Sequence, residues 1–420
     1  MRDYKLILQF ILLFLLVSCQ TNEAEDWDVA IDLKMVAEDK RVTLSWTPEK
    51  NSFQYYQVIR TVVKNGENYS TVIAEFYRDD KLIYIDKEVP YTRDVRYEVR
   101  GYFNTPSGFS SSQSSVSNVC RLFRDIDLLT IVPDDVLLHP GVDRLFFVNR
   151  QSGIITVHDY RNNTFVSHDL QSGLGFCSFN GNELIVPRTD GWVFIYDVNT
   201  MSIIDQMSVS NYPLFSCVSA NGFLFSNTTS SSKPIIVTDR ATKMEASSLI
   251  NYGDDHKRLK IVEGSNTEIF GVSQDDVTFY TFDAAGKLLS RKYKRTWNEN
   301  EKNSTNFQVY SLHKKIFSAP YGNIYDSRIY FESNLPRGLR VFSDLTLTPD
   351  NHYAVAGNKD SKALEIFDIN GPYRYYQTVQ LKGYPLRVFN DGWSIYVVSR
   401  ISELDDYSGQ EYIVENPAIF

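Results

Sequence analysis

The sequence predicts an all-β protein, with a small β-sandwich followed by a larger ring of repeated four-stranded sheets. Three observations support this prediction. Aromatic residues make up 14% of the 420 residues, and their rings pack well on pleated sheets. Short stretches of alternating apolar and polar residues recur along the chain and end at turn residues. From about residue 125 onward, a strand–turn–strand pattern recurs with a period of about 40 residues, which is typical of a ring of small sheets.

The first residues predict export. A charged start with Arg2 and Lys5 precedes an almost wholly apolar run from Leu6 to Val17, which is shorter than the ~20 residues needed to cross a bilayer. The run ends in Leu-Val-Ser followed by Cys19, which resembles the lipobox of bacterial lipoprotein signal peptides. This resemblance implies that residues 1–18 are removed and that a lipid on Cys19 anchors the chain in a membrane. An ordinary signal peptide with an incidental cysteine is the alternative.

The segment that starts at this cysteine, residues 19–28, is polar and acidic and is expected to act as a flexible tether. It resembles the acidic export signal of surface-exposed lipoproteins in some Gram-negative bacteria. The resemblance implies an outer-membrane lipoprotein exposed on the cell surface, with a periplasmic orientation left open as the alternative.

Residues 29–120 contain the short alternating strands of a β-sandwich. The clearest predicted strands are Val42–Pro48, Tyr55–Val62 and Val95–Tyr102. The stretch Lys64–Glu67, with Asn-Gly at its centre, predicts a hairpin turn.

This pattern resembles a fibronectin type III domain, which is an immunoglobulin-like sandwich. The core tryptophan of that family corresponds to Trp46, its strand-C tyrosine to Tyr56 and its strand-F tyrosine to Tyr97. The resemblance implies a spacer or adhesion module without catalytic activity. The Arg-Gly-Asp tripeptide that binds integrins in some family members is absent.

The remaining residues, 121–420, repeat a pair of strands of which the second ends in aspartate. The aspartates are Asp159, Asp197, Asp239, Asp283 and Asp368. Successive members of this series are 38, 42, 44 and 85 residues apart. The widest gap spans two periods and leaves room for a degenerate repeat around residues 316–330. Seven repeats predict a seven-bladed β-propeller, with six blades as the main structural alternative.

The last repeat lacks a full outer strand, which residues from the segment 121–130 are expected to supply. Such a closure protects sheet edges that otherwise invite aggregation. The repeats resemble the broad quinoprotein-like and WD-repeat-like group of propellers. The Trp-Asp dipeptide of WD repeats does not stand at the blade ends, so membership of that subgroup is doubtful.

Propellers carry their binding sites on the loops at one end of a central channel. Alignment of the repeats places cations where second strands end in neighbouring blades, and these cations are Arg150, Arg188, Lys359 and Arg400. Together they would suit a carboxylate, sulfate or phosphate group, which arginine can bind through two hydrogen bonds. The alternative is ordinary solvated loop charge, balanced by neighbouring acids such as Asp190.

Aromatic residues on the predicted loops are a second indication of binding. Tyr212 and Tyr384 are expected in matching loops before first strands, and Trp297 is expected in a long polar loop. Flat rings in such places can stack against sugar faces. The alternative is a tyrosine-rich protein that packs these rings between blades. Trp192 and Trp393, which each follow Asp-Gly, are expected to be packing residues.

Signals for metal, redox or catalytic chemistry are weak. No histidine pair has metal-type spacing, and the chain has neither a phosphate-binding P-loop nor a nucleophile elbow. Cys177 and Cys217 are expected to be small buried thiols. No cofactor or metal is expected, and the net charge of −9 argues against general nucleic-acid binding.

The sequence therefore predicts a lipid-anchored protein of the cell envelope whose propeller is a non-catalytic recognition head. The expected ligand is an extracellular glycan or a protein partner. By resemblance, accessory lipoproteins of Gram-negative glycan-uptake systems are often built this way. The alternatives are a propeller-based carbohydrate-active enzyme, either a lyase or a glycosidase, and a scaffold subunit of an envelope complex.

Overall fold

A computed structural model shows an all-β protein that divides into two compact units, Met1–Leu128 and Leu129–Phe420. Within the described residues, no helix is both long and apolar enough to traverse a membrane. The predicted signal peptide, Cys19 and the acidic tether lie outside the described residues. The structure describes residues 31–38, 41–48, 53–64, 67–78, 80–102, 114–124, 129, 133–250, 258–262, 265–272, 277–294, 307–310, 315–319, 321–326, 329–401 and 411–419.

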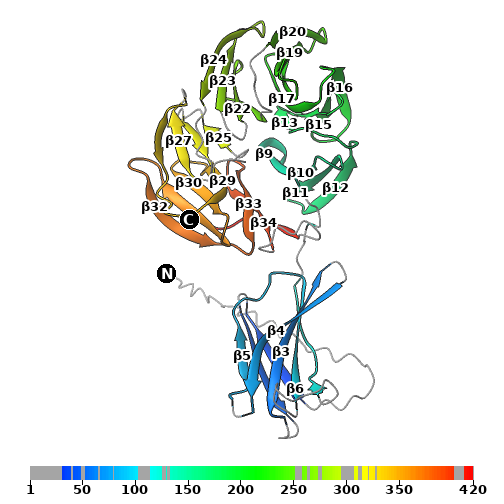
Figure 1. Ribbon diagram of the computed structural model, residues 1–420, viewed down its shortest axis with the longest axis vertical. Coiled ribbons are helices and arrows are strands. Elements are labelled where there is room, and N and C mark those ends of the chain that lie inside the picture. Colours follow the sequence, from blue (N-terminus) through cyan, green and yellow to red (C-terminus); the bar gives the residue numbers. More distant parts are fainter. Residues whose placement is uncertain are drawn as a thin grey trace, which may run out of the picture. The chain divides into compact units, whose positions relative to one another are not determined.

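The N-terminal unit contains two antiparallel sheets (Figure 1). The first has the strand order β1-β2-β5, and the second has the order β4-β3-β6-β7 with β8 also paired to β6. The three strands predicted from alternation are present as β2, β3 and β6. The bounds are β1 (Ile31–Ala37), β2 (Val42–Pro48), β3 (Tyr55–Lys64), β4 (Glu67–Tyr77), β5 (Ile83–Asp86), β6 (Asp94–Tyr102), β7 (Ser114–Val116) and β8 (Cys120–Phe123).

Aromatic residues pack together with aliphatic ones in the core of this unit. Trp46, Tyr56 and Tyr97 are all buried in one apolar cluster, and the ring centroids of Trp46 and Tyr56 are 6.1 Å apart. The Tyr97 hydroxyl donates a hydrogen bond of 2.8 Å to the buried carboxylate of Asp86, which also pairs with Arg60 at 2.9 Å. The buried acid is therefore compensated by a hydroxyl and a guanidinium, as a charge in a core must be.

Seven sheets follow one another along the described part of the C-terminal unit. Sheets 1 to 6 have four strands each, joined in chain order, and sheet 7 has three. A short 3-10 helix, η2 (Pro140–Val142), lies between the first two strands of sheet 1. Sheet 1 contains β9 (Asp135–His139), β10 (Arg144–Asn149), β11 (Ile154–Asp159) and β12 (Thr164–Asp169); sheet 2 contains β13 (Ser178–Asn180), β14 (Glu183–Pro187), β15 (Trp192–Asp197) and β16 (Ile203–Ser208); sheet 3 contains β17 (Leu214–Ala220), β18 (Phe223–Thr228), β19 (Ile235–Asp239) and β20 (Met244–Leu249). Sheet 4 contains β21 (Arg258–Ile261), β22 (Glu268–Val272), β23 (Val277–Phe282) and β24 (Leu288–Lys294); sheet 5 contains β25 (Phe307–Tyr310), β26 (Lys315–Ser318), β27 (Asn323–Asp326) and β28 (Phe331–Asn334); sheet 6 contains β29 (Phe342–Leu347), β30 (Tyr353–Asn358), β31 (Ala363–Asp368) and β32 (Arg374–Gln380); sheet 7 contains β33 (Tyr384–Asn390), β34 (Ile395–Arg400) and β35 (Tyr412–Glu415).

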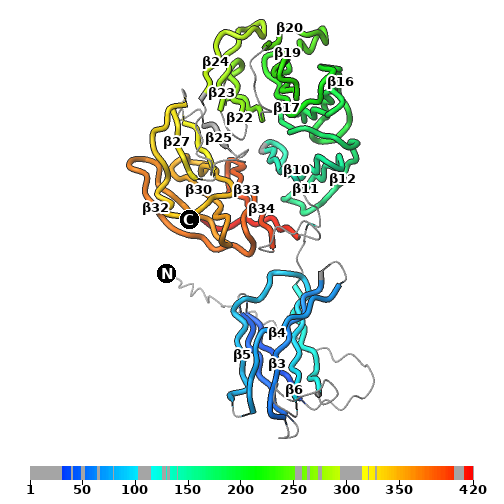
Figure 2. Tube along the Cα trace, in the orientation of Figure 1, coloured from blue at the N-terminus to red at the C-terminus, as the bar shows by residue number. Residues whose placement is uncertain are grey.

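Each sheet shares an apolar core with the next one. Phe146 of sheet 1 packs in one cluster with Leu184 of sheet 2, and equivalent clusters join the later sheets in turn. A further cluster joins Val398 of sheet 7 to Phe147 of sheet 1, so the packing returns to its starting point. In Figures 1 and 2 the sheets surround a common centre; β9, β25 and β29 lie toward it in Figure 1, whereas β12, β20 and β32 lie outside.

The segment 121–130, which was expected to complete the last repeat, does so only in part. Arg121–Phe123 were expected to help close the ring, but they lie in β8 and pair with β6 of the N-terminal unit. Leu122 is buried in that unit's core, and Arg121 pairs with Asp94 at 2.8 Å. The predicted boundary after residue 120 therefore falls inside β8. Leu129, which lies in the same predicted segment, does extend sheet 7, because it exchanges backbone hydrogen bonds of 2.8 and 3.0 Å with Tyr412.

Gly191, in the turn between β14 and β15, lies in close contact with the connection between β16 and β17. Gly191 has a φ of +85°, and a Cβ there would lie 1.8 Å from the carbonyl oxygen of Ser210. We expect Gly191→Ala to separate these loops and to lower the free energy of unfolding by ~1–3 kcal/mol, measured by urea denaturation. Gly222→Ala is the matched control, because Gly222 has a φ of +79° with nothing within 4 Å of its Cβ position. An equal loss in both variants would show that the clash contributes nothing.

Candidate functional site

The four predicted cations lie at equivalent strand ends. Arg150, Arg188 and Lys359 directly follow β10, β14 and β30, and Arg400 is the last residue of β34. We call these four residues the strand-end cations. Their strand ends adjoin the beginnings of first strands, because Asp134 accepts a 2.7 Å hydrogen bond from the Arg150 backbone N–H and β33 begins opposite Arg400.

Two of the strand-end cations have different surroundings. Arg188 pairs with the Asp190 carboxylate at 3.1 Å and donates a 3.0 Å hydrogen bond to Gln171, so its charge is balanced locally as the alternative interpretation expects. Both guanidinium groups lie over a ring, Arg150 over Phe176 with Cζ 4.0 Å from the centroid and Arg188 over Phe194 at 5.2 Å, and the Nε of each is buried without a hydrogen-bond partner. Arg150 differs because no carboxylate of the described residues forms an ion pair with it.

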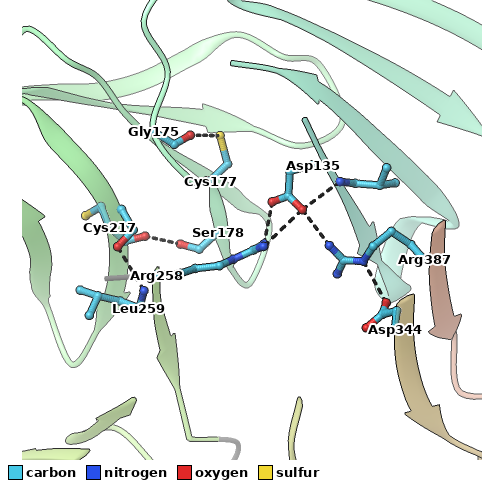
Figure 3. Close-up of polar contacts among 11 residues, drawn as sticks. Asp135, Gly175, Cys177, Ser178, Cys217, Arg258, Leu259, Asp344 and Arg387 are labelled. Atoms are coloured by element: carbon cyan, nitrogen blue, oxygen red, sulfur yellow. Dashed lines mark hydrogen bonds and ion pairs between the residues drawn. The ribbon is translucent and has the colours of Figure 1, made fainter. Parts of the chain in front are cut away.

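Sequence reasoning missed a second group of charges on the first strands of four sheets. We call this group the inner-strand cluster, and Figure 3 shows the carboxylates and guanidinium groups in it. It consists of Asp135 in β9, Arg258 and Lys260 in β21, Asp344 in β29 and Arg387 in β33.

Asp135 is the centre of the inner-strand cluster. Arg258 donates hydrogen bonds of 2.6 and 3.3 Å to it, and Arg387 donates one of 2.8 Å. Figure 3 shows the two guanidinium groups approaching this carboxylate from opposite sides. Arg387 also donates through Nε to Asp344 at 2.9 Å. Since all four side chains are at most 7% exposed, these contacts join sheets 1, 4, 6 and 7 through a water-poor interior.

Lys260 is the third basic side chain of the inner-strand cluster. Lys260 follows Arg258 by two residues, so both side chains leave the same face of β21. Burial lowers the pKa of Lys260 to about 7, and Arg258 and Arg387 add to this effect. Burial also lowers the pKa of Arg258, whereas at Arg387 the neighbouring Asp344 and Asp135 outweigh burial and raise the pKa.

Phe176 connects the inner-strand cluster to the strand-end cations. The Cζ atom of Arg258 lies 4.6 Å from the centroid of the ring that also carries Arg150. A ring face attracts cations by about 0.5–2 kcal/mol, so Phe176 holds two guanidinium groups near each other without an added carboxylate. With the partly exposed Arg150 and Lys260, the result is a positively charged site suited to an anionic group.

The low pKa of Lys260 makes the folding stability dependent on pH. Between its folded pKa of about 7 and its unfolded pKa of about 10.4, the unfolded chain binds more protons than the folded one. The free energy of unfolding therefore falls as the pH is lowered from about 10.4 to about 7, and this group changes it little below pH 7. We expect Lys260→Met to stabilise the protein more at pH 6 than at pH 9, measured by urea denaturation. A gain that is equal at both pH values would exclude a shifted titration of Lys260.

The predicted aromatic residues have separate environments. Tyr212 lies in the connection before β17 and is 44% exposed, as a loop residue should be. Tyr384 was expected in a loop, but it is the first residue of β33, and the Lys362 ammonium lies 5.4 Å from its ring centroid. It belongs to the strand because its backbone pairs with Arg400. Trp297 lies outside the described residues.

The expectation that two tryptophans are packing residues was wrong for Trp393, whereas the Trp192 ring lies 6.3 Å from that of Phe194. Trp393 is 85% exposed and Trp192 is 38% exposed. Trp393 lies in the turn between β33 and β34, which is at the opposite strand end from the strand-end cations. The turn is held through backbone N–H groups that donate to Asp391, so it needs no packing by the indole ring.

The cysteine prediction is confirmed. Cys177 and Cys217 are both buried and free, and burial raises the pKa of each thiol to about 12. Thiols with such values carry almost no thiolate at neutral pH and are poor nucleophiles. Among the residues that the structure describes, no group of three or more histidine, cysteine or acidic side chains is arranged to hold a metal ion.

No protein-family model matches this chain, and no curated protein is significantly similar to it. The site itself is therefore the basis for assigning a function.

Proposed function

We propose that this chain is a lipoprotein of the cell envelope, exposed on the outer membrane, whose C-terminal unit binds an acidic extracellular glycan without cleaving it. In this proposal the C-terminal unit is a seven-bladed β-propeller and the N-terminal unit is a fibronectin type III-like spacer. The propeller is supported by seven consecutive sheets whose shared cores lead from the last sheet back to the first. The spacer is supported by two antiparallel sheets around Trp46, Tyr56 and Tyr97.

The surroundings of Arg150 carry the proposal. Its guanidinium is stacked on Phe176, has no ion-pair partner among the described residues and shares this ring with Arg258 of the inner-strand cluster. A charged group that is partly desolvated and unpaired is costly unless a counter-charge binds to it. A carboxylate or sulfate of a ligand supplies such a counter-charge and can accept two parallel hydrogen bonds from arginine.

The position of these charges favours small anionic groups on a chain-like ligand. Arg258 and Arg387 are almost fully buried on inner strands, whereas Arg150 and Lys260 are partly exposed. A single uronate or sulfate group is small enough to contact cations that are only partly exposed. A broad acidic protein surface would instead need cations spread over an exposed face.

The test is a binding screen of residues 22–420 against uronate-bearing and sulfated polysaccharides, with analysis of products for every positive. The panel contains polygalacturonate, alginate, chondroitin sulfate and heparin, each beside its carboxyl-reduced or desulfated form. We expect binding to at least one acidic glycan, loss of this binding when its charges are removed, and no cleavage products. Binding is also expected to weaken at high salt, since exposed charges are screened.

The other outcomes decide against the proposal in different ways. Release of shortened products would make the protein an enzyme. No binding to any acidic glycan would overturn glycan recognition, and capture of a defined envelope protein would then support the scaffold alternative.

A further inference from the structure

A polar cleft of about 390 Å³ lies between sheets 2 and 3. Tyr212 lines it from the connection before β17, and Lys233 and Glu245 line it from sheet 3 and its β18–β19 turn. Asn211, Ser210 and Ser232 add an amide and two hydroxyl groups, and the buried Ile236 forms part of the floor. The volume lies at the small end of the range for ligand sites, which suits one or two sugar rings.

The charged residues of this cleft neutralise each other. The Lys233 ammonium lies 3.1 and 3.2 Å from the two oxygens of Glu245, and no other charged side chain lines the cleft. The cleft therefore offers donors and acceptors without a net charge. Such a set matches the hydroxyl groups of a neutral sugar, and the exposed ring of Tyr212 matches its apolar face.

The cleft adjoins the strand-end cations through the backbone. Leu214, two residues after Tyr212, donates a 3.1 Å hydrogen bond to the carbonyl oxygen of Arg188. Arg150 and Arg188 are in turn both bound to the connection between sheets 1 and 2, because Leu174 N–H donates to the Arg150 carbonyl and Arg188 donates to Gln171. The segment that carries Tyr212 is therefore joined by hydrogen bonds to the strand ends that carry Arg188 and Arg150.

We propose that this cleft binds a neutral sugar ring of the glycan whose acidic group is bound at the strand-end cations. The inference rests on the proposed function for the acidic group, but the cleft can be tested alone. Its distinguishing property is that binding depends on the ring of Tyr212 and not on charge.

The test uses saturation-transfer NMR of residues 22–420 with the methyl glycosides of glucose, galactose, mannose and N-acetylglucosamine. We expect signals from at least one glycoside, and these signals should persist at high salt, because the cleft carries no net charge. Tyr212→Ala is expected to weaken binding about tenfold, whereas Tyr212→Phe should retain it because the stacking ring remains.

Tyr375→Ala is the matched control, since Tyr375 has the same exposure, 45% against 44%, but lies on β32 of sheet 6. It should leave the signals unchanged. Absence of signals from all four glycosides, or equal signals in the wild-type and Tyr212→Ala proteins, would overturn the cleft as a sugar site. Failure of the acidic-glycan screen is a separate result, because it removes the proposed function without changing the methyl-glycoside signals.

Discussion

Replacing Asp135 with asparagine is expected to lower the free energy of unfolding of the C-terminal unit by about 3–5 kcal/mol. This carboxylate accepts from Arg258 at 2.6 and 3.3 Å and from Arg387 at 2.8 Å, and its side chain is only 3% exposed. The amide retains the shape but not the charge. Arg387 keeps its contact with Asp344, whereas Arg258 loses its carboxylate partner in a low-dielectric interior. Urea denaturation followed by far-UV circular dichroism measures the loss.

Two further variants test whether the loss of stability comes from the unpaired buried charge. Asp190→Asn removes an exposed partner of Arg188 and is expected to change stability by less than about 1 kcal/mol. Adding Arg258→Met to Asp135→Asn removes the stranded guanidinium and should recover part of the lost stability, since apolar replacements of buried ion pairs are often tolerated. If Asp135→Asn unfolds at the same urea concentration as the wild-type protein, the inner-strand cluster does not stabilise the contact between sheets 1, 4 and 7.

The strands were predictable where the pattern along the chain is local. The second strands of the first two repeats end at Asp159 and Asp197 as predicted, because the side chain of each aspartate accepts hydrogen bonds from the turn that follows. The start of a first strand was less predictable. Tyr384 was expected in the loop before its strand, yet β33 begins at Tyr384, and Pro385 is tolerated so close to the start of a strand.

The inner-strand cluster could not be predicted because its partners meet only after the sheets have packed. Asp135 and Arg387 are 252 residues apart, and nothing near either residue indicates the other. In β21, Arg258 and Lys260 alternate with apolar residues, a pattern that is equally typical of a strand with one face in water. A charge on each of several first strands is the one available signal, and it becomes informative only when those strands are known to face a common centre.

Replacing Arg150 and Arg188 together with alanine is expected to abolish binding of the acidic glycan while changing the free energy of unfolding by less than about 1 kcal/mol. The two single variants should differ. Arg188 already pairs with Asp190 at 3.1 Å, so its removal leaves a carboxylate and weakens binding modestly. Arg150 has no such partner among the described residues, and losing its charged hydrogen bonds is expected to weaken binding by more than tenfold. Isothermal titration with the strongest acidic binder measures both effects.

Arg374→Ala controls for the loss of a positive charge, because Arg374 is exposed at the start of β32 on the outside of sheet 6. If it weakens binding as much as Arg150→Ala does, the glycan responds to overall charge and the strand-end cations have no special role. Unchanged binding in the Arg150→Ala, Arg188→Ala double variant would exclude these two residues from the site.

Arg150→Lys then distinguishes a positive charge from a shaped guanidinium. Lysine retains the charge and part of the attraction to the Phe176 ring, but it cannot donate two parallel hydrogen bonds to one carboxylate or sulfate. If the anionic group is bound in this paired geometry, Arg150→Lys should lose most of the affinity that Arg150→Ala loses. If the Phe176 ring only holds a cation near the inner-strand cluster, Arg150→Lys should bind almost as well as the wild-type protein. The ratio of these two affinities therefore reports whether this site recognises the shape of the anionic group or only its charge.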